Sequence, residues 1–215
     1  MLAREALQVF RAARYTELTA LVTSMLARTA SRAGHQVEAA EHLVEALRLA
    51  EEGGNHLLQV GVIGLMAEDL ARHGEAAAAR ERCADAARRA VLIGGPGVHE
   101  SLLERVRGFA LMQLGELDDA GRVLDRSLGK ARESGLSYEV ALTSLVRADL
   151  GRIRNDGSDL EANAEAAEIL GRLGVVSVDA IALSPTAGDL ALGPRVAETE
   201  VGLLDRQLAA PVAEV

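Results

Sequence analysis

The chain has 215 residues, of which 49% are apolar and 26% charged, and its formal net charge is −9. This length and apolar fraction predict one domain, or one domain and a tail, with a substantial core. The acidic balance argues against nucleic-acid binding, because phosphate contacts need clustered Lys and Arg. A single cysteine, Cys83, excludes an intramolecular disulfide and a cysteine-based zinc site.

The sequence carries no sign of a membrane span or of a secretory signal. No apolar run reaches the roughly 18 residues of a transmembrane candidate. Residues 1–15 carry Arg and Glu through their apolar stretch, unlike a signal peptide. A cytoplasmic location is the resulting expectation.

Apolar residues recur at spacings of three and four along most of the chain, which is typical of amphipathic helices. Val62, Leu65, Met66 and Leu70 show this spacing before Gly74. Aromatic residues make up only 2% of the chain, so we expect a core mainly of Leu, Ala and Val. Ala and Leu are also strong helix formers. The predicted helices are residues 3–13, 18–33, 36–52, 57–73, 75–92, 100–114, 117–133, 137–154 and 158–172.

Four glycines, Gly34, Gly74, Gly115 and Gly157, recur every 40 to 42 residues. Each is expected to end one helix, because glycine takes the left-handed conformation without a steric penalty. Mostly small residues recur at matched positions around these glycines, which would let the two helices of each pair approach closely. The matched sets are Ala27, Ala67, Gly108 and the larger Leu150 before the glycine, then Ala39, Ala79, Ala120 and Ala162, then Leu43, Cys83, Leu124 and Ala166, and finally Ala46, Ala86, Ser127 and Ile169.

A glycine followed five residues later by alanine, between paired helices, resembles the tetratricopeptide repeat. A standard repeat of that kind has 34 residues. The resemblance is therefore to the long-repeat variant of bacterial ATP-dependent transcriptional activators of the LuxR and maltose-regulator type, and of ATPase-linked adenylate and guanylate cyclases. Residues 165–175 resemble the closing helix of those arrays. The resemblance implies an all-α right-handed superhelix, a solenoid of about four antiparallel helix pairs, over residues 1–175.

The resemblance also implies a function. It suggests a protein-protein interaction scaffold or a signal-sensing repeat domain, part of or derived from such a larger regulator. The partner would be a protein or peptide, or the regulator's own ATPase or effector module, and binding would shift the equilibrium of the attached module. A free-standing peptide-binding adaptor that self-associates is the alternative, and a helical enzyme is a distant third.

In such arrays the first helix of each pair lines the concave face. Mapping this sequence onto that pattern places an arginine-rich set of residues on or near that face. Guanidinium groups hold carboxylates in bidentate pairs, so such a face suits an acidic or extended peptide. Solvated helix faces with charge pairs to Glu and Asp are the alternative interpretation. The set comprises Arg28, Arg32, Glu68, Arg72, Arg105, Phe109, Gln113, Arg147 and Arg154.

The sequence contains no motif that predicts a catalytic, cofactor-binding or metal-binding site. The P-loop, the dinucleotide-binding glycine pattern and the metalloprotease motif are missing. The glycine-rich segment 94–97 is predicted to be a turn, and residues 155–159 lack the ligand spacing of a calcium loop. The five histidines, His35, His42, His56, His73 and His99, are expected as surface or helix-capping residues, and Cys83 as an inert buried thiol. We therefore expect no catalytic residue, metal ligand or cofactor, and no enzyme.

Residues 176–215 differ in character, because three of the four prolines fall there. The stretch 176–194 is predicted to be a linker. Residues 195–209 follow Pro194 and could form an amphipathic helix that caps the last repeat. We therefore divide the chain into a repeat domain at 1–175 and a C-terminal segment at 176–215.

Overall fold

The computed structural model describes residues 2–174, which form nine α-helices and one short 3₁₀ helix. Every predicted helix is present, with ends that differ by a few residues. None of the described helices is both long and apolar enough to cross a membrane. The predicted linker and the predicted helix at 195–209 lie outside the described residues. The elements are α1 (Leu2–Ala12), α2 (Thr16–Arg32), α3 (Gln36–Glu52), α4 (His56–Arg72), α5 (Ala76–Val91), η1 (Gly97–His99), α6 (Glu100–Gln113), α7 (Leu117–Glu133), α8 (Ser137–Arg154) and α9 (Asp159–Arg172).

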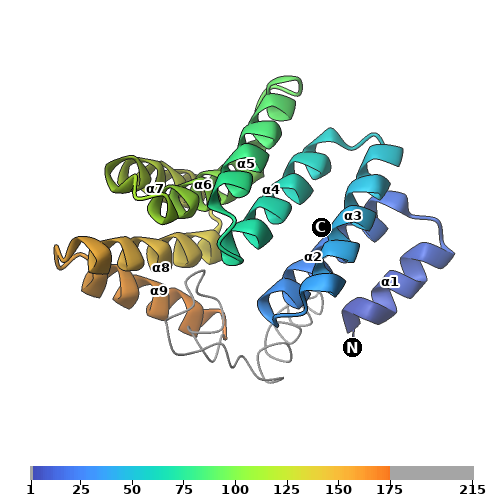
Figure 1. The fold of residues 1–215 in the computed structure, drawn as a ribbon. Coiled ribbons are helices and arrows are strands. Elements are labelled where there is room, and N and C mark those ends of the chain that lie inside the picture. Colours follow the sequence, from blue (N-terminus) through green and yellow to red (C-terminus); the bar gives the residue numbers. More distant parts are fainter. Residues whose placement is uncertain (1, 175–215) are drawn as a thin grey trace.

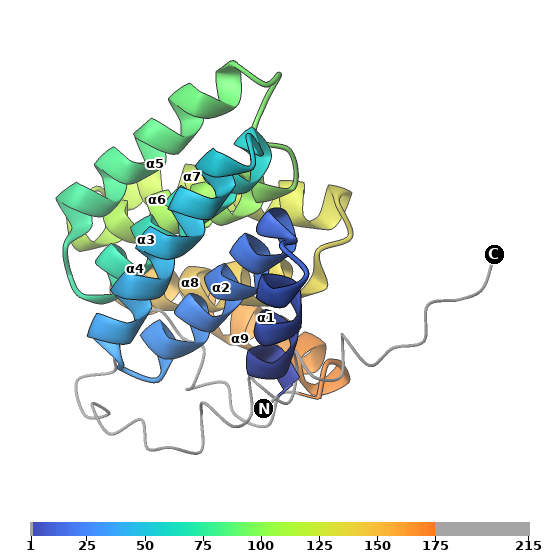
Figure 2. The ribbon, with the colours of Figure 1, turned by 90° about the vertical axis from the view of Figure 1, so that its right-hand side faces the viewer.

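The helices pack as consecutive antiparallel pairs, α2 with α3, α4 with α5, α6 with α7, and α8 with α9 (Figure 1). α1 packs on α2 and forms ion pairs with α3, so it takes the place of a helix from a preceding pair. Helices α2, α4, α6 and α8 contact one another in succession and form an inner layer, while α3, α5, α7 and α9 form the outer layer. Figure 2 views this stack from the side of α1. The described chain is thus an all-α, solenoid-like repeat, as predicted.

The turn glycines act as the repeat pattern predicted. Gly34, Gly74 and Gly115 have φ angles of +79°, +79° and +80°, in the left-handed region. In the first pair, the amide of His35 donates to the carbonyl of Ala30 at 2.9 Å, the bond that closes a Schellman turn. The fourth turn differs, because Asn155 takes the left-handed conformation and ends α8.

Small residues lie buried where the two helices of a pair cross. Ala27, Ala39 and Ala46 of the first pair are completely buried. The third pair also approaches closely, because a Cβ added to Gly108 would lie 2.6 Å from Cδ2 of Leu124. The small residues therefore set the distance between paired helices, as their recurrence predicted.

Glycines also bring two inner helices together. On α4, a Cβ at Gly61 would lie 2.6 Å from Cε1 of His99, and a Cβ at Gly64 would lie 3.0 Å from Cδ2 of Leu103 on α6. α4 and α6 can contact each other because both positions lack a side chain.

The largest described core cluster spans α4 to α8 and includes Phe109 and Cys83. Burial raises the pKa of the Cys83 thiol to about 12. The thiol is therefore protonated at neutral pH and lacks the reactivity of a thiolate.

The connections between pairs differ in length. Three residues connect α3 to α4, and three connect α7 to α8, whereas eight residues, 92–99, connect α5 to α6. The end of α5 that leads into this longer connection lies away from α7 (Figure 1).

Candidate functional site: an ionic cluster on the inner helices

Charged side chains of all four inner helices meet in one place. We call this group the ionic cluster, and it consists of Glu68, Glu139, Arg28, Arg32, Arg105 and Tyr138. Glu68 on α4 is the centre of one half. Its Oε1 lies 3.2 Å from Nη2 of Arg32 and 3.4 Å from Nη1 of Arg105, and its Oε2 lies 3.4 Å from Nε of Arg28. Arg32 and Arg105 are almost completely buried, while the Arg28 side chain is 23% exposed.

Glu139, in the first turn of α8, forms the other half of the cluster. Its Oε1 lies 3.1 Å from Nη2 of Arg28, and its Oε2 lies 3.1 Å from Nε of Arg105. The neighbouring Tyr138 accepts a hydrogen bond from Nη1 of Arg32. The Cζ atoms of Arg28 and Arg32 lie 5.4 and 5.6 Å from the centre of the Tyr138 ring, within the range of a cation–π contact. The first inner helix is thus tied directly to the last.

Electrostatics keep both glutamates ionised. Burial alone would raise the pKa of Glu68, but the guanidinium groups of Arg105, Arg28 and Arg32 outweigh burial and hold this pKa well below its ordinary value. Arg72 lowers the pKa of Glu68 further. The pKa of Glu139 is also lowered: Arg105 and Arg28 overcome the effects of burial and of the Glu68 charge.

The cluster is not fully satisfied by hydrogen bonds. Within the described structure, the buried Nη2 of Arg105 donates no hydrogen bond, and the buried Oε2 of Glu68 accepts none. Buried charged atoms without a hydrogen bond cost free energy, so an arrangement that retains them is less stable than a completely bonded one. The cluster is therefore a place where a ligand group or a rearrangement could gain contacts.

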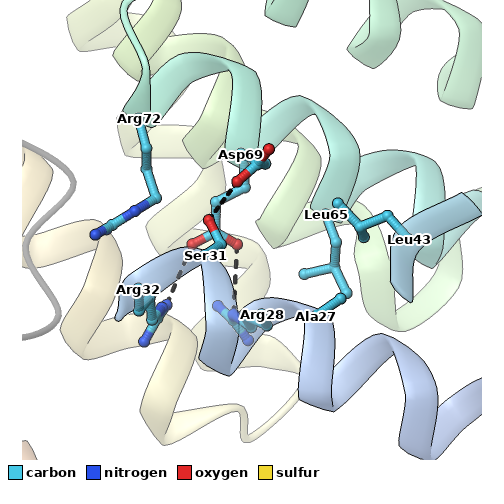
Figure 3. Close-up of a pocket in the computed structure, with 9 residues that line it drawn as sticks. Ala27, Arg28, Ser31, Arg32, Leu43, Leu65, Asp69 and Arg72 are labelled. Atoms are coloured by element: carbon cyan, nitrogen blue, oxygen red, sulfur yellow. Dashed lines mark hydrogen bonds and ion pairs between the residues drawn. The ribbon is translucent and has the colours of Figure 1, made fainter. Parts of the chain in front are cut away.

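A small recess opens beside the cluster between α2 and α4 (Figure 3). Its volume is about 10 Å³, the space of about one water molecule. Figure 3 shows Arg28 and Arg32 on one side and Arg72 on another, with Ser31 hydrogen-bonded to Asp69 between them. The apolar side of the recess is formed by Ala27, Leu43 and Leu65.

The structure brings together some residues of the predicted binding face. Arg28, Arg32, Glu68 and Arg105 meet in the ionic cluster, and Arg72 lines the adjacent recess. Arg32, Glu68 and Arg105 are buried, and of these three Arg32 and Glu68 line the recess. Their role in binding a partner stays a prediction.

The other four predicted residues lie outside the cluster. Phe109 is buried in the core, and Nε2 of Gln113 donates to the carbonyl of Ala71 at 2.8 Å. Arg147 pairs with Asp125 at 3.1 Å. Nη2 of Arg154 on α8 donates to Asp118 at 3.0 Å and to the carbonyl of Leu117 at 2.8 Å, both on α7.

Sequence reasoning missed Glu139 and Tyr138. They contact residues more than 100 positions earlier in the chain. No local pattern marks such a contact, because it depends on how strongly the whole stack curves. In the sequence, Glu139 is an ordinary acidic residue in the first turn of a helix, where it complements the helix dipole.

The histidines expected at the surface lie mostly near helix ends, and two of them approach one carboxylate. His35 Nδ1 and His42 Nε2 lie 3.4 and 3.6 Å from Glu38. Across residues 2–174, no three His, Cys, Asp or Glu side chains are grouped so that they could hold a metal ion.

Comparisons with protein-family models, with curated proteins and with solved structures gave no match. The fold class therefore rests on the chain's own repeat pattern and on its consecutive helix pairs, which are compatible with a tetratricopeptide-like fold.

Proposed function

We propose that the chain is a protein-interaction and signal-sensing repeat domain whose inner face recognises an acidic segment of a partner. The observation that carries this proposal is the ionic cluster. Glu68 lies among four arginines, Arg28, Arg32, Arg72 and Arg105, which come from three helices. On a chain of formal net charge −9, this concentration of guanidinium groups is a local positive site.

The accessible part of the cluster suits a competing carboxylate. Arg28 is the cluster arginine with a partly exposed side chain, and it holds both Glu68 and Glu139. A carboxylate from a partner would compete with Glu139 for Arg28 through charge-assisted hydrogen bonds. Because the Arg28–Glu139 pair ties α2 to α8, exchange of this pair would alter the curvature of the stack.

A change of curvature is a means of signalling. A ligand shifts an equilibrium by its difference in affinity for two states. An acidic segment that binds the more open stack would favour that state and pass the change to an attached module. This is a binding function, without a chemical step.

The repeat length supports a more specific origin. With a period of 40 to 42 residues, the chain resembles the long repeats of bacterial ATP-dependent transcriptional regulators and cyclases, and we infer that it is part of or derived from such a protein. A reading frame in the source genome that joins these repeats to an ATPase module would support this origin. A frame that encodes the repeats alone would favour a free-standing adaptor.

The test is the binding of a fluorescent peptide of alternating Glu and Ser, measured by fluorescence anisotropy at physiological salt. We expect Arg28→Gln to weaken binding roughly tenfold, because hydrogen bonds to charged groups contribute about 1.5–3 kcal/mol. The matched control is Arg147→Gln, which removes an inner-helix arginine that pairs with Asp125 outside the cluster. Circular dichroism of both variants checks the fold.

The two variants separate specific recognition from general attraction. An affinity that falls equally in both variants would mean that the peptide follows overall charge, and the proposal would be wrong. Absence of saturable binding to the unmodified chain would also contradict it.

A further inference from the structure

The surface over α6 is hollowed beside α5. A cavity of about 450 Å³ lies between α5 and α6, and one of about 230 Å³ lies between α5, α6 and α7. Arg80 and Arg107 line both cavities, and we call the two together the outer furrow. Leu103 and Leu111 of α6 form its floor. These two residues are eight positions apart, which corresponds to about 12 Å of helix. The furrow is therefore long enough for two turns of a helix.

The furrow lies where the outer helices α5 and α7 run in different directions. The connection between their pairs, residues 92–99, has eight residues, whereas the connections between the other pairs have three. An ion pair joins α5 to α7 near the start of both helices, between Arg80 and Glu116 at 3.1 Å. By contrast, α3 and α5 are joined near their ends by Glu51 and Arg89. From the Arg80–Glu116 ion pair, α5 and α7 diverge along their length (Figure 1).

The wall formed by α5 ends in exposed apolar side chains. Ala84, Ala87 and Arg88 line the furrow. Val91 and Leu92 lie four residues after Ala87 and Arg88, on the same helix face. These two residues are 76% and 86% exposed. Large apolar side chains exposed beside an apolar depression are typical of an interaction site.

Five arginines line the furrow, together with four carboxylates, those of Glu100, Glu104, Glu116 and Asp119. Each arginine is about half exposed or more, and each forms an ion pair with a carboxylate of this chain. Glu104 is shared between Arg107 and Arg126, at 3.8 and 2.9 Å. Exposed ion pairs of this kind contribute only about 0–1 kcal/mol, so they exchange easily for pairs with another molecule. The arginines are Arg80, Arg88, Arg107, Arg122 and Arg126.

We propose that the outer furrow binds an amphipathic helix of a partner protein, with small and apolar residues on the face that enters it and acidic residues on its flanks. The walls and floor are helices, whose backbone groups are already hydrogen-bonded within the helix. A peptide buried there must satisfy its own backbone, and a helix does so. Ala84 and Ala87 allow its backbone to approach α5, Val91 and Leu92 extend the apolar contact, and acidic flanks pair with the arginines.

The test uses two labelled model peptides, both helical, with Leu and Ala on one face. One carries Glu on its flanks, and the other carries Lys at the same positions. By fluorescence anisotropy we expect the full chain to bind the Glu peptide at least tenfold more tightly than the Lys peptide. The double variant Arg107→Glu with Arg126→Glu is expected to reverse this preference.

A matched pair of variants tests the place of binding. Ala84→Arg fills the furrow and is expected to weaken binding of the Glu peptide at least tenfold. Ala167→Arg changes the equivalent position of the fourth repeat, ten residues after its turn glycine and also exposed, and is expected to leave the affinity within twofold. Equal affinities for the two peptides, or equal losses in the two alanine variants, would overturn the proposal.

A second copy of the chain is the competing occupant. Sedimentation velocity distinguishes it: a concentration-dependent dimer that Ala84→Arg abolishes and Ala167→Arg retains would assign the furrow to self-association and overturn the proposal of a partner helix. A monomer that binds the Glu peptide supports it. These measurements do not involve Arg28, so they stand or fall separately from recognition at the ionic cluster.

Discussion

His99 shows how one residue can give this fold a dependence on pH. It lies at the start of α6 against Gly61 of α4, and burial lowers its pKa below the ordinary value of 6.5, although the charge of Glu139 acts in the opposite direction. The unfolded chain therefore binds a proton on His99 at a higher pH than the folded chain does. The free energy of unfolding should accordingly fall as the pH drops below about 6.5.

Replacement of His99 by Gln should reduce this dependence. Urea denaturation of both proteins between pH 7.5 and 5.5 measures it, and the variant is expected to show the smaller slope of stability against pH. Glu68 and Glu139 act in a separate, lower pH range. Because their pKa values are lowered in the folded chain, the stability that they contribute is lost only as the pH falls below about 4.5. An unchanged slope in the variant would show that His99 is not the group responsible.

Between paired helices, identical glycine substitutions should have opposite effects. Gly108 of α6 faces Leu124, which is completely buried and cannot move away from a new Cβ. Gly129 of α7 has no atom within 4 Å of a Cβ. Overpacking costs about 1–3 kcal/mol, whereas Gly to Ala in an open helical position gains up to about 1 kcal/mol. We expect Gly108→Ala to destabilise and Gly129→Ala to stabilise the fold in urea denaturation.

Leu124 supplies the control for this pair. If the clash is the cause, Gly108→Ala should cost less in a Leu124→Ala background, since the space then exists. A destabilisation by Gly108→Ala that is the same in both backgrounds would assign the effect to something other than this contact.

The elements were largely predictable, and the reason is local. The apolar spacing and the turn glycines act within a few residues, so the helices and the first three turns follow from them. The matched small residues predicted where paired helices approach. The divergence of α5 from α7 was not predictable, because 94–97 indicates a turn without indicating the direction in which the next helices leave it. The outer furrow depends on that direction.

The curvature of the whole molecule was the least predictable property of the candidate site. The resemblance placed Arg28 and Arg105 on or near the concave face, but it gave no reason to bring α8 back to α2. That contact depends on the sum of small rotations between successive pairs and on the glycines of α4 that allow α6 to approach. Glu139 thus became the acceptor for two arginines that sequence reasoning had assigned to a partner.

Closure of the stack by Arg28 and Glu139 can be measured as a coupling energy. Both side chains are mostly buried and 3.1 Å apart. Contacting residues in such a network show coupling of about 0.5–3 kcal/mol in a double-mutant cycle. We expect a value above 1 kcal/mol for Arg28→Gln with Glu139→Gln, from urea denaturation of the four proteins.

The exposed pair Arg4–Glu38, also between helices and 3.4 Å apart, is the control, and its coupling should remain below about 1 kcal/mol. High salt should reduce the Arg4–Glu38 coupling and affect the Arg28–Glu139 coupling less, because buried charges are screened less.

Small-angle X-ray scattering measures the dimensions of the whole molecule. Glu139→Gln should increase the radius of gyration, since it releases α8 from α2. A variant with unchanged dimensions and a coupling no larger than that of the exposed pair would mean that helix packing alone sets the curvature, and an acidic ligand competing for Arg28 would then have no closed state to open.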